Sequence, residues 1–576
     1  MAAGITAVVL APLVLPGYVL RYDMVFVPRQ PLSWEMIVPA DALPRAVPLD
    51  ALVSLLNVAV PGWLLQRIAL VAVVYLSALG AARLVPTDRA LTKAVAAFAY
   101  AWTPFLAERL LLGQWALLLA YACLPFMVAA ARDLRAGRQK ALPRLIIAAA
   151  PAAVTPTGGL IALVTVAILL PLRSRATAIA LAAVTALNAP WLLASLASAA
   201  GGRSDPEGIA QFAARSENWA GTLVALAGTG GIWNAQTVPA SRVTAAAPVV
   251  TLLLLAVAVV GLRVLRTRWP GGAVRLFVLA AGGFVLAAAG AGPTAPLLEW
   301  LVTHVPGAGL LRDGQKFLIP YALTLALGFA LGAEALAERL SRRFEPAAGL
   351  VVLAGALLLP IVALPDLAFG VGGALRPVRY PADWDRVAAI VAAAPGEVLS
   401  LPFEGYQRYP WNRDVVVRDP APRYLDAPVL MNDALRVGAV IVDGENPRAA
   451  AAWAHLEAGR PAASLGVKWV LVRGEVPVAT LAGLRLVHEG PDLRLWENPA
   501  IGAGVRLSAA SRRIPSLTAH LLAGTVVVVA VLALLPVRRR SWYGPRTHES
   551  GEEQKWPSWP RSSSLPSPGV SSASSV

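Results

Sequence analysis

The side chains best placed to do chemistry are charged residues that stand beside long apolar segments. Asp23 directly follows an apolar stretch near the N-terminus, and Arg21 and Arg29 flank it in the chain. A carboxylate in this setting is costly to bury unless it is paired, so we expect either an ion pair with one of these arginines or a functional role. The residue types alone leave both alternatives open.

A second group of charges precedes the apolar segment that begins at Phe317. Arg312 and Lys316 lie within one short stretch there. The free N–H groups at a helix N-terminus, together with two cations, would form a receptor for a phosphate group at the depth of lipid headgroups. The alternative is an ordinary interaction of both side chains with bulk lipid headgroups.

Three further charged residues are weaker candidates for substrate binding. Glu108 and Arg109 occupy a tight turn between two apolar segments, where we expect them to pair with each other. Glu35 is the next acid after Asp23 in the first long loop.

Other kinds of catalytic chemistry have no support in the sequence. It contains no P-loop, no H-E-x-x-H, no G-x-S-x-G and no C-x-x-C motif, and its five histidines and single cysteine are too scattered to suggest metal ligands. We therefore predict no dedicated metal site and leave the cofactor unknown, with a divalent cation still open. Basic residues do not interleave with aromatic ones, so nucleic-acid binding is not expected.

The composition predicts a membrane protein. Of 576 residues, 57% are hydrophobic and 15% charged, whereas soluble domains contain roughly 25% charged residues. The apolar residues gather in runs long enough to approach the thickness of a bilayer core. We predict a mainly α, polytopic protein with about twelve transmembrane helices. They lie near residues 5–20, 63–84, 91–107, 110–131, 144–155, 158–172, 176–199, 244–262, 276–290, 317–340, 349–364 and 515–536.

The positions of the basic residues predict the topology. The stretch at residues 156–159 (Pro-Thr-Gly-Gly) could be a kink in one helix or the turn between two short ones. Only the two-helix alternative places nearly all of the net charge of +16 on one face. The positive-inside rule makes that face cytoplasmic. We therefore expect a multi-pass protein of the plasma membrane with both termini in the cytoplasm.

This topology divides the chain into four parts. Within the first loop, apolar residues recur at helical spacing from Leu49 to Leu56, as in a helix that lies in the membrane interface. Charged residues return to soluble levels after the eleventh predicted span, which indicates an α/β domain on the outer side. The predicted parts are a membrane domain at 1–366 with outer loops at 21–62, 201–242 and 291–316, the α/β domain at 367–513, a last transmembrane helix at 514–537, and a disordered cytoplasmic tail at 538–576.

Several motifs resemble known membrane families. The stretch 61–67 (Pro-Gly-Trp-Leu-Leu-Gln-Arg), the Ala107-Glu108-Arg109 turn and the long first loop resemble the membrane part of actinobacterial arabinofuranosyltransferases, which belong to the GT-C glycosyltransferases. The stretches 311–317 and 465–472, followed by Trp-Glu-Asn-Pro at 496–499, resemble YfhO-like membrane proteins, which share this architecture.

The resemblance implies a reaction on the outer face of the membrane. An acid in the first outer loop, here Asp23, would act as general base on an acceptor hydroxyl, while Arg312 and Lys316 would stabilise the departing polyprenyl phosphate. The partners would be membrane lipids, a polyprenyl-phosphate sugar donor and a cell-envelope glycan or glycolipid acceptor. Two alternatives remain: a transporter or flippase of a lipid-linked precursor, and a non-catalytic scaffold for envelope assembly.

Overall fold

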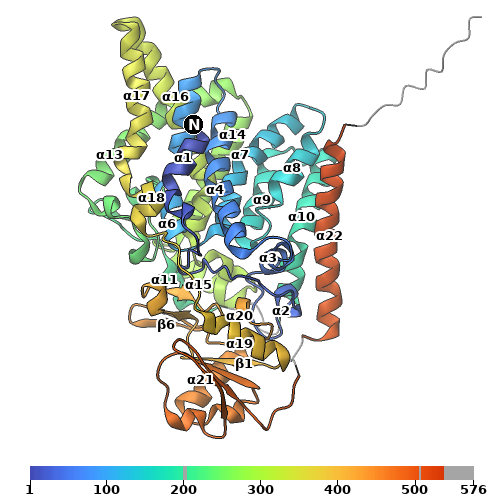
Figure 1. The fold of residues 1–576 in the computed structure, drawn as a ribbon. Coiled ribbons are helices and arrows are strands. Elements are labelled where there is room, and N and C mark those ends of the chain that lie inside the picture. The colour runs from blue at the N-terminus through green and yellow to red at the C-terminus, as the bar shows by residue number, and fades with distance from the viewer. Residues whose placement is uncertain (199–203, 505–507, 537–576) are drawn as a thin grey trace, which may run out of the picture. The chain divides into compact units, whose positions relative to one another are not determined.

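We describe a computed structural model of the chain, which covers residues 1–198, 204–504 and 508–536 (Figure 1). The predicted tail at 538–576 and the start of the predicted loop at 201–242 lie outside the described residues. By its contacts the chain divides into two compact units, Met1–Leu534 and Leu535–Val576. Everything below concerns the first unit.

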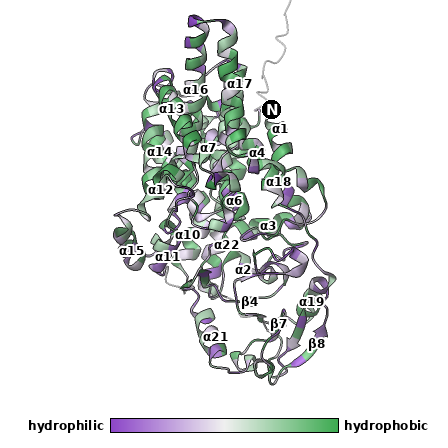
Figure 2. Cartoon of the chain, turned by 90° about the vertical axis from the view of Figure 1, so that its left-hand side faces the viewer, coloured by the Kyte–Doolittle hydropathy of each residue, from purple (hydrophilic) through white to green (hydrophobic). Residues whose placement is uncertain are grey.

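Helices dominate the first part of the chain, as the apolar runs predict. Within the described ranges, eight helical segments are long and apolar enough to cross a membrane. They are α4 (Gly62–Leu84), α7 (Trp115–Arg135), α10 (Arg175–Leu196), α13 (Ala246–Arg268), α14 (Gly272–Ala289), the segment Gly314–Arg343 that contains α16 (Ile319–Arg343), α17 (Pro346–Ala363) and α22 (Ala510–Leu534). Figure 2 shows these helices coloured mostly as hydrophobic. Large apolar side chains are exposed on them, such as Leu252 of α13, Val351 of α17 and Val528 of α22, which suits contact with lipid.

Four of the twelve predicted spans contain shorter helices. These are α1 (Ala2–Val9), α5 (Ala90–Ala101), α8 (Ala141–Ala149) and α9 (Pro156–Leu169). A Thr-Pro pair explains two of the breaks, because Thr103 and Thr155 each accept a backbone N–H at 3.2 Å and so begin a new helix. The stretch at 156–159 therefore starts a separate helix, as the charge distribution predicts. The break at Thr103 creates α6 (Pro104–Leu111), which carries Glu108 and Arg109.

Small residues allow the central helices to approach closely. A side chain at Gly261 of α13 would place its Cβ 1.7 Å from the carbonyl oxygen of Gly328 in α16. Such contact needs glycine, and it lets two helix backbones pack without intervening side chains. Helix α16 is accordingly buried along most of its length and forms the centre of the bundle.

The predicted interfacial helix is present as α3 (Leu49–Asn57). Its polar residues face inward: Ser54 donates to the carbonyl of Pro31 at 2.9 Å, and Asn57 accepts the N–H of Gln30. Its apolar residues Leu52 and Leu55 are exposed. This inverted pattern fits a helix whose apolar side faces lipid. Other short helices lie in the loops that the sequence places outside: α2 (Trp34–Ile37), α11 (Glu207–Phe212), α12 (Gly221–Ala227) and α15 (Ala295–His304).

A mixed sheet lies in the segment before α22, where the sequence predicts an α/β domain. Its strands follow the order β4-β1-β7-β9-β8, with β4, β1 and β7 parallel and the last two pairs antiparallel. Their bounds are β1 (Val398–Leu401), β4 (Val429–Leu430), β7 (Trp469–Val472), β8 (Arg485–Glu489) and β9 (Arg494–Glu497).

Helices cover both faces of this sheet. Alternate residues of a strand point to opposite faces: Val398 packs in the same cluster as Trp384 of α19 (Ala382–Ala393), whereas Leu399 packs with Ala449 of α21 (Pro447–Glu457). Strands β1 and β7 are buried on both faces of the sheet. Two short helices, α18 (Ala368–Gly373) and α20 (Ala421–Tyr424), complete the segment.

Two small hairpins lie outside the main sheet. In one, β6 (Val440–Val442) pairs with β5 (Leu435–Val437). The other joins β2 (Tyr406–Gln407) to β3 (Val417–Arg418). This second hairpin positions part of the candidate site.

Candidate functional site

Asp23 projects from a tight turn that is held on two sides. The backbone of Tyr22 pairs with β3, donating to the carbonyl of Val416 at 2.7 Å and accepting the N–H of Arg418 at 2.9 Å. On the other side, Gly113 packs so closely that a Cβ there would lie 2.3 Å from the carbonyl oxygen of Arg21. Tyr22 itself has a φ of 43°, which is uncommon for a residue with a side chain. The turn is therefore fixed by contacts from both distant segments.

The carboxylate of Asp23 is held by neutral donors. Tyr406 of β2 donates its hydroxyl proton to Oδ1 at 2.6 Å, and Gln114 donates from Nε2 to Oδ2 at 3.4 Å. Burial and the Asp23 charge raise the pKa of Tyr406 well above its usual range, so it remains a donor. A carboxylate has about four acceptor positions, so these two contacts leave room for a further proton donor.

The ion pair of Asp23 with Arg21 or Arg29, one of the two alternatives that the residue types leave open, does not form. Arg21 donates from Nε to the carbonyl oxygen of Leu111 at 2.7 Å and stacks on Tyr22. Arg29 is exposed. The reason is local: the turn at Tyr22 directs the Arg21 side chain toward α6, where an unpaired carbonyl at the helix end accepts its proton.

Arg109 forms the centre of a buried polar network. It is fully buried and contacts both carboxylate oxygens of Asp313, at 2.8 and 3.0 Å. It also donates to Gln114 at 2.6 Å and to Gln315. Because Gln114 in turn contacts Asp23, the network reaches from the loop before α16 to the N-terminal turn.

Asp313 places the ammonium group of Lys316 in this network. Lys316 Nζ lies 3.4 Å from the Asp313 carboxylate and also interacts electrostatically with Asp23. Burial opposes ionisation of Asp313, but Arg109 and Lys316 outweigh it and hold its pKa at about 2. One quarter of the Lys316 side chain remains exposed.

The predicted Glu108–Arg109 pair is replaced by contacts with distant residues. Adjacent residues of a helix do not face each other, so Arg109 pairs with Asp313 and Glu108 accepts from Gln315 at 3.0 Å. Glu108 also lies against the carboxyl group of Glu217. Burial, followed by this neighbouring carboxylate, raises the pKa of Glu108 well above its usual range.

A second arginine pairs with Glu217. Arg242 donates to Glu217 from Nε and Nη2, both at 2.8 Å, and both side chains are buried. Gln315 connects this pair to the rest of the network because it also donates to the carbonyl of Gly230 at 3.1 Å. The network therefore gathers α6, the loop that contains Glu217 and the start of the α16 segment around one buried core of charge.

Arg312 and Lys316 point to different places. Arg312 lies 3.4 Å from Glu445, just before α21, and stacks on Phe212. Glu445 also pairs with Arg45 and accepts from Ser204. Burial would raise the pKa of Glu445, but the two arginines keep it below its usual range. Arg312 thus ties the loop before α16 to the sheet region and does not face Asp23.

Glu35 lies apart from this network. It is in α2, where its carboxylate accepts the N–H of Ala40 at 3.1 Å. Burial raises its pKa to about 7. Its charged neighbours include Arg512 at the start of α22, and Arg512 donates to the carbonyl of Ala40 at 2.7 Å.

Several site residues were not selected from the sequence. Tyr406 and Glu217 approach the site only through the fold, and no local pattern distinguishes them. Asp313 and Gln315 each neighbour a candidate in the chain, so a polar residue beside a candidate charge was the available signal for these two, whereas Gln114 lies five positions after Arg109. In the described ranges, no group of three or more His, Cys, Asp or Glu side chains is arranged to hold a metal ion.

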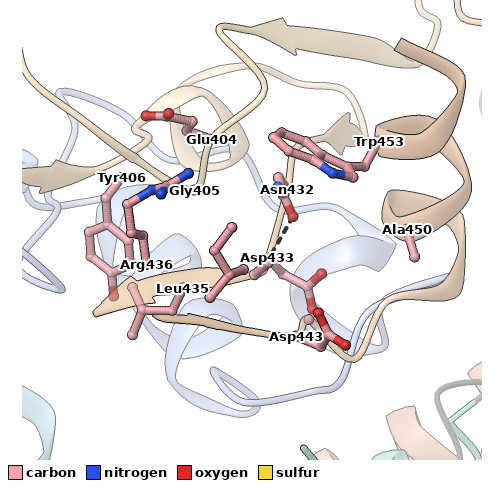
Figure 3. Close-up of a pocket in the computed structure, with 13 residues that line it drawn as sticks. Glu404, Gly405, Tyr406, Asn432, Asp433, Leu435, Arg436, Asp443, Ala450 and Trp453 are labelled. Carbon is pink, nitrogen blue, oxygen red and sulfur yellow. Dashed lines mark hydrogen bonds between the residues drawn. The ribbon is translucent and has the colours of Figure 1, made fainter. Parts of the chain in front are cut away.

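Two cavities are lined by residues of the turn or by its contacts. One, of about 340 Å³, lies beside β2 and the β5–β6 hairpin and includes Tyr406, whose hydroxyl contacts Asp23, in its lining (Figure 3). The other, of about 190 Å³, includes Arg21 of the turn and Asn412.

Comparison with solved structures places the fold. The chain is similar to the cryo-EM structure of arabinofuranosyltransferase AftD from Mycobacteria, with a TM-score of 0.51 and 18% identity over 87% of this chain and 40% of that one. A mutant form of AftD gives a TM-score of 0.51 and 16% identity over 88% of this chain and 42% of that one. No protein-family profile and no curated protein matches the sequence.

The chain spans about two fifths of the length of the solved chains that it matches. At this level of identity the comparison establishes shared architecture. The predicted resemblance to an arabinofuranosyltransferase is thereby confirmed for the fold: this is a polytopic helical membrane protein built like part of AftD, with a small β region before its last helix.

Proposed function

We propose that this protein is a membrane glycosyltransferase of the cell envelope that moves a sugar from a polyprenyl-phosphate donor to a glycan or glycolipid acceptor. The AftD-like architecture supports the enzyme class. The observation that carries the proposal is the placement of Asp23 and Lys316 on one polar network beside the bundle. A carboxylate and a cation so arranged are the two groups that such a transfer needs.

The proposed step divides the work between these two residues. The acceptor hydroxyl oxygen attacks the anomeric carbon and forms the new glycosidic bond, while its proton passes to Asp23. The bond between the anomeric carbon and the phosphate oxygen breaks with its electron pair, and Lys316 stabilises the departing polyprenyl phosphate. A single displacement of this kind inverts the anomeric configuration. Arg312 pairs with Glu445 and in this scheme has a structural role, linking the loop before α16 to the sheet region.

The buried network would hold both groups in place. Tyr406 and Gln114 orient the Asp23 carboxylate, and Asp313 positions the Lys316 ammonium. Preorganised groups lower the barrier because they need no rearrangement when charge develops. Following the positive-inside distribution, the proposal places this site on the outer face of the membrane, with both termini in the cytoplasm.

The test is sugar transfer by purified protein in detergent or nanodiscs. Asp23→Asn keeps the size of the side chain but removes the base, and we expect at least a hundredfold loss of turnover, within the range typical of general bases. The matched control is Asp426→Asn, because Asp426 is exposed. It should transfer like the wild type.

Lys316→Gln provides an independent arm. We expect it to reduce turnover and raise the KM for the donor, since the phosphate loses its cation both in the bound donor and in the departing group. Transfer by Asp23→Asn at the wild-type rate would refute the assignment of the base. Movement of a labelled polyprenyl-phosphate sugar across proteoliposomes without transfer would favour the flippase alternative.

A further inference from the structure

The larger cavity has the chemical character of a ligand site. Its volume of about 340 Å³ falls at the lower end of the roughly 300–1,000 Å³ typical of small-molecule sites. Figure 3 shows Trp453 on one side of it and Arg436 with Tyr406 on the other. Its polar lining comprises Glu404, Asn432, Asp433, Arg436 and Asp443.

The aromatic wall is built by the sheet region. Trp453 lies on α21, and its ring stacks against Phe403, which follows β1, at a centroid distance of 6.3 Å. Asn446 begins α21 by accepting the N–H groups of Arg448 and Ala449. A ring fixed on one side by Phe403 can offer its other surface to a flat apolar patch of a ligand.

The acidic wall is partly preorganised. Asp433 Oδ2 accepts the N–H groups of Glu445 at 2.8 Å and Asn446 at 3.1 Å, which fixes its carboxylate. Glu404 and Asp443 are exposed acids that line the same cavity. The lining therefore offers several hydrogen-bond acceptors around an indole ring.

The charges select among ligand classes. Three carboxylates against one guanidinium disfavour a phosphate or another anion. Arg436 disfavours an organic cation, and the carboxylates are not arranged as a metal cluster within the described part of the chain. A neutral polyhydroxylated molecule satisfies every group, because its hydroxyls can donate to the acids and accept from Arg436 and Asn432 while its C–H face rests on Trp453.

We propose that this cavity binds a neutral saccharide and, resting on the transferase function above, that it holds the part of the acceptor glycan next to the reacting hydroxyl. Tyr406 connects the two places, since it is one of the residues that line the cavity and its hydroxyl contacts Asp23.

Direct binding to the purified full-length protein tests this inference. The probes are arabino-, xylo- and manno-oligosaccharides. Inorganic phosphate, spermidine and Mg²⁺ are tested in the same way, as probes of the anion, organic-cation and metal alternatives. We expect saturable binding of at least one neutral oligosaccharide by calorimetry. Trp453→Ala should weaken its Kd by about tenfold, and Trp453→Phe, which retains a ring, should recover most of that loss.

Two further variants change exposed side chains of the lining, where a substitution should disturb folding less than the loss of Trp453 does. Asp443→Asn and Glu404→Gln alter exposed side chains and should each weaken binding by about threefold, within the range expected for a hydrogen bond. Glu457→Gln alters an exposed acid of α21 outside the cavity lining and should bind like the wild type. Melting temperatures of all variants identify those that are folded.

The outcomes separate this inference from the proposed function. Asp23→Asn should bind the oligosaccharide normally even if it cannot transfer sugar. Binding with the expected mutant pattern and no transfer from any donor would support the saccharide site and refute the transferase. Unchanged Kd values in Trp453→Ala and Asp443→Asn, or saturable binding of spermidine or Mg²⁺ alone, would overturn the saccharide site whatever the transfer assay shows.

Discussion

Tyr406 donates a 2.6 Å hydrogen bond to Oδ1 of Asp23, although 383 positions of sequence separate the two residues. The contact forms because the Tyr22 backbone joins the β2–β3 hairpin through β3. The candidate base therefore belongs to the membrane part of the chain, and a donor that orients it belongs to the sheet region. Function should depend on both.

Removing the Tyr406 hydroxyl should reduce catalysis. Hydrogen bonds to charged groups contribute roughly 1.5–3 kcal/mol, so we expect Tyr406→Phe to lower kcat by about tenfold with less than about threefold change in donor KM. Tyr22→Phe is the control, because its ring lies 6.4 Å from that of Tyr406 but its hydroxyl donates to Gln236. Equal kcat losses in both variants would contradict a specific role for Tyr406.

Truncating Arg109 should destabilise the fold. Arg109→Ala leaves the Asp313 carboxylate buried without its main partner, which costs about 3–5 kcal/mol. Arg138→Ala removes an exposed pair with Asp133 and should cost less than about 1 kcal/mol. Unfolding in detergent measures both. If the charge imbalance is the cause, Arg109→Ala combined with Asp313→Ala should be more stable than Arg109→Ala alone.

Glu35 should make stability depend on pH. Burial raises its pKa from 4.5 to about 7, so the folded state binds the proton more tightly, and this contribution is lost as pH rises from 4.5 through 7. Glu35→Gln should match the wild type near pH 4.5 and exceed its stability at pH 8 by on the order of 3 kcal/mol. Thermal unfolding at both pH values, with Glu457→Gln as control, checks this. An equal stability difference at the two pH values would exclude the effect.

Hydrophobic patterning predicts where the helices are and misjudges where they end. Each predicted span contains a helix, since an apolar run must be buried or face lipid. The predicted span at 91–107 is divided at Thr103-Pro104, because threonine begins a helix and proline cannot continue the one before it. Hydropathy averages do not register such single-residue signals.

Only those residues of the candidate site that have a local signal in the sequence could be selected in advance. Asp23, Arg109 and Lys316 stand out because charge beside an apolar segment is costly. Their partners are not predictable in this way, since Asp313 lies 204 positions from Arg109 and Tyr406 lies further still from Asp23. Neighbouring charges in the chain suggested the wrong pairs, because helix geometry turns Glu108 and Arg109 in different directions.

The pairing of Tyr22 with β3 has a consequence for biosynthesis. The turn at Tyr22 acquires its final hydrogen bonds only when residues 416–418 have been translated and delivered to the same side of the membrane. Contacts of such long sequence separation form late in folding. A nascent chain that stops before this hairpin would hold helices in the bilayer but no completed site, so the enzyme proposed here can become active only after most of its helices are inserted.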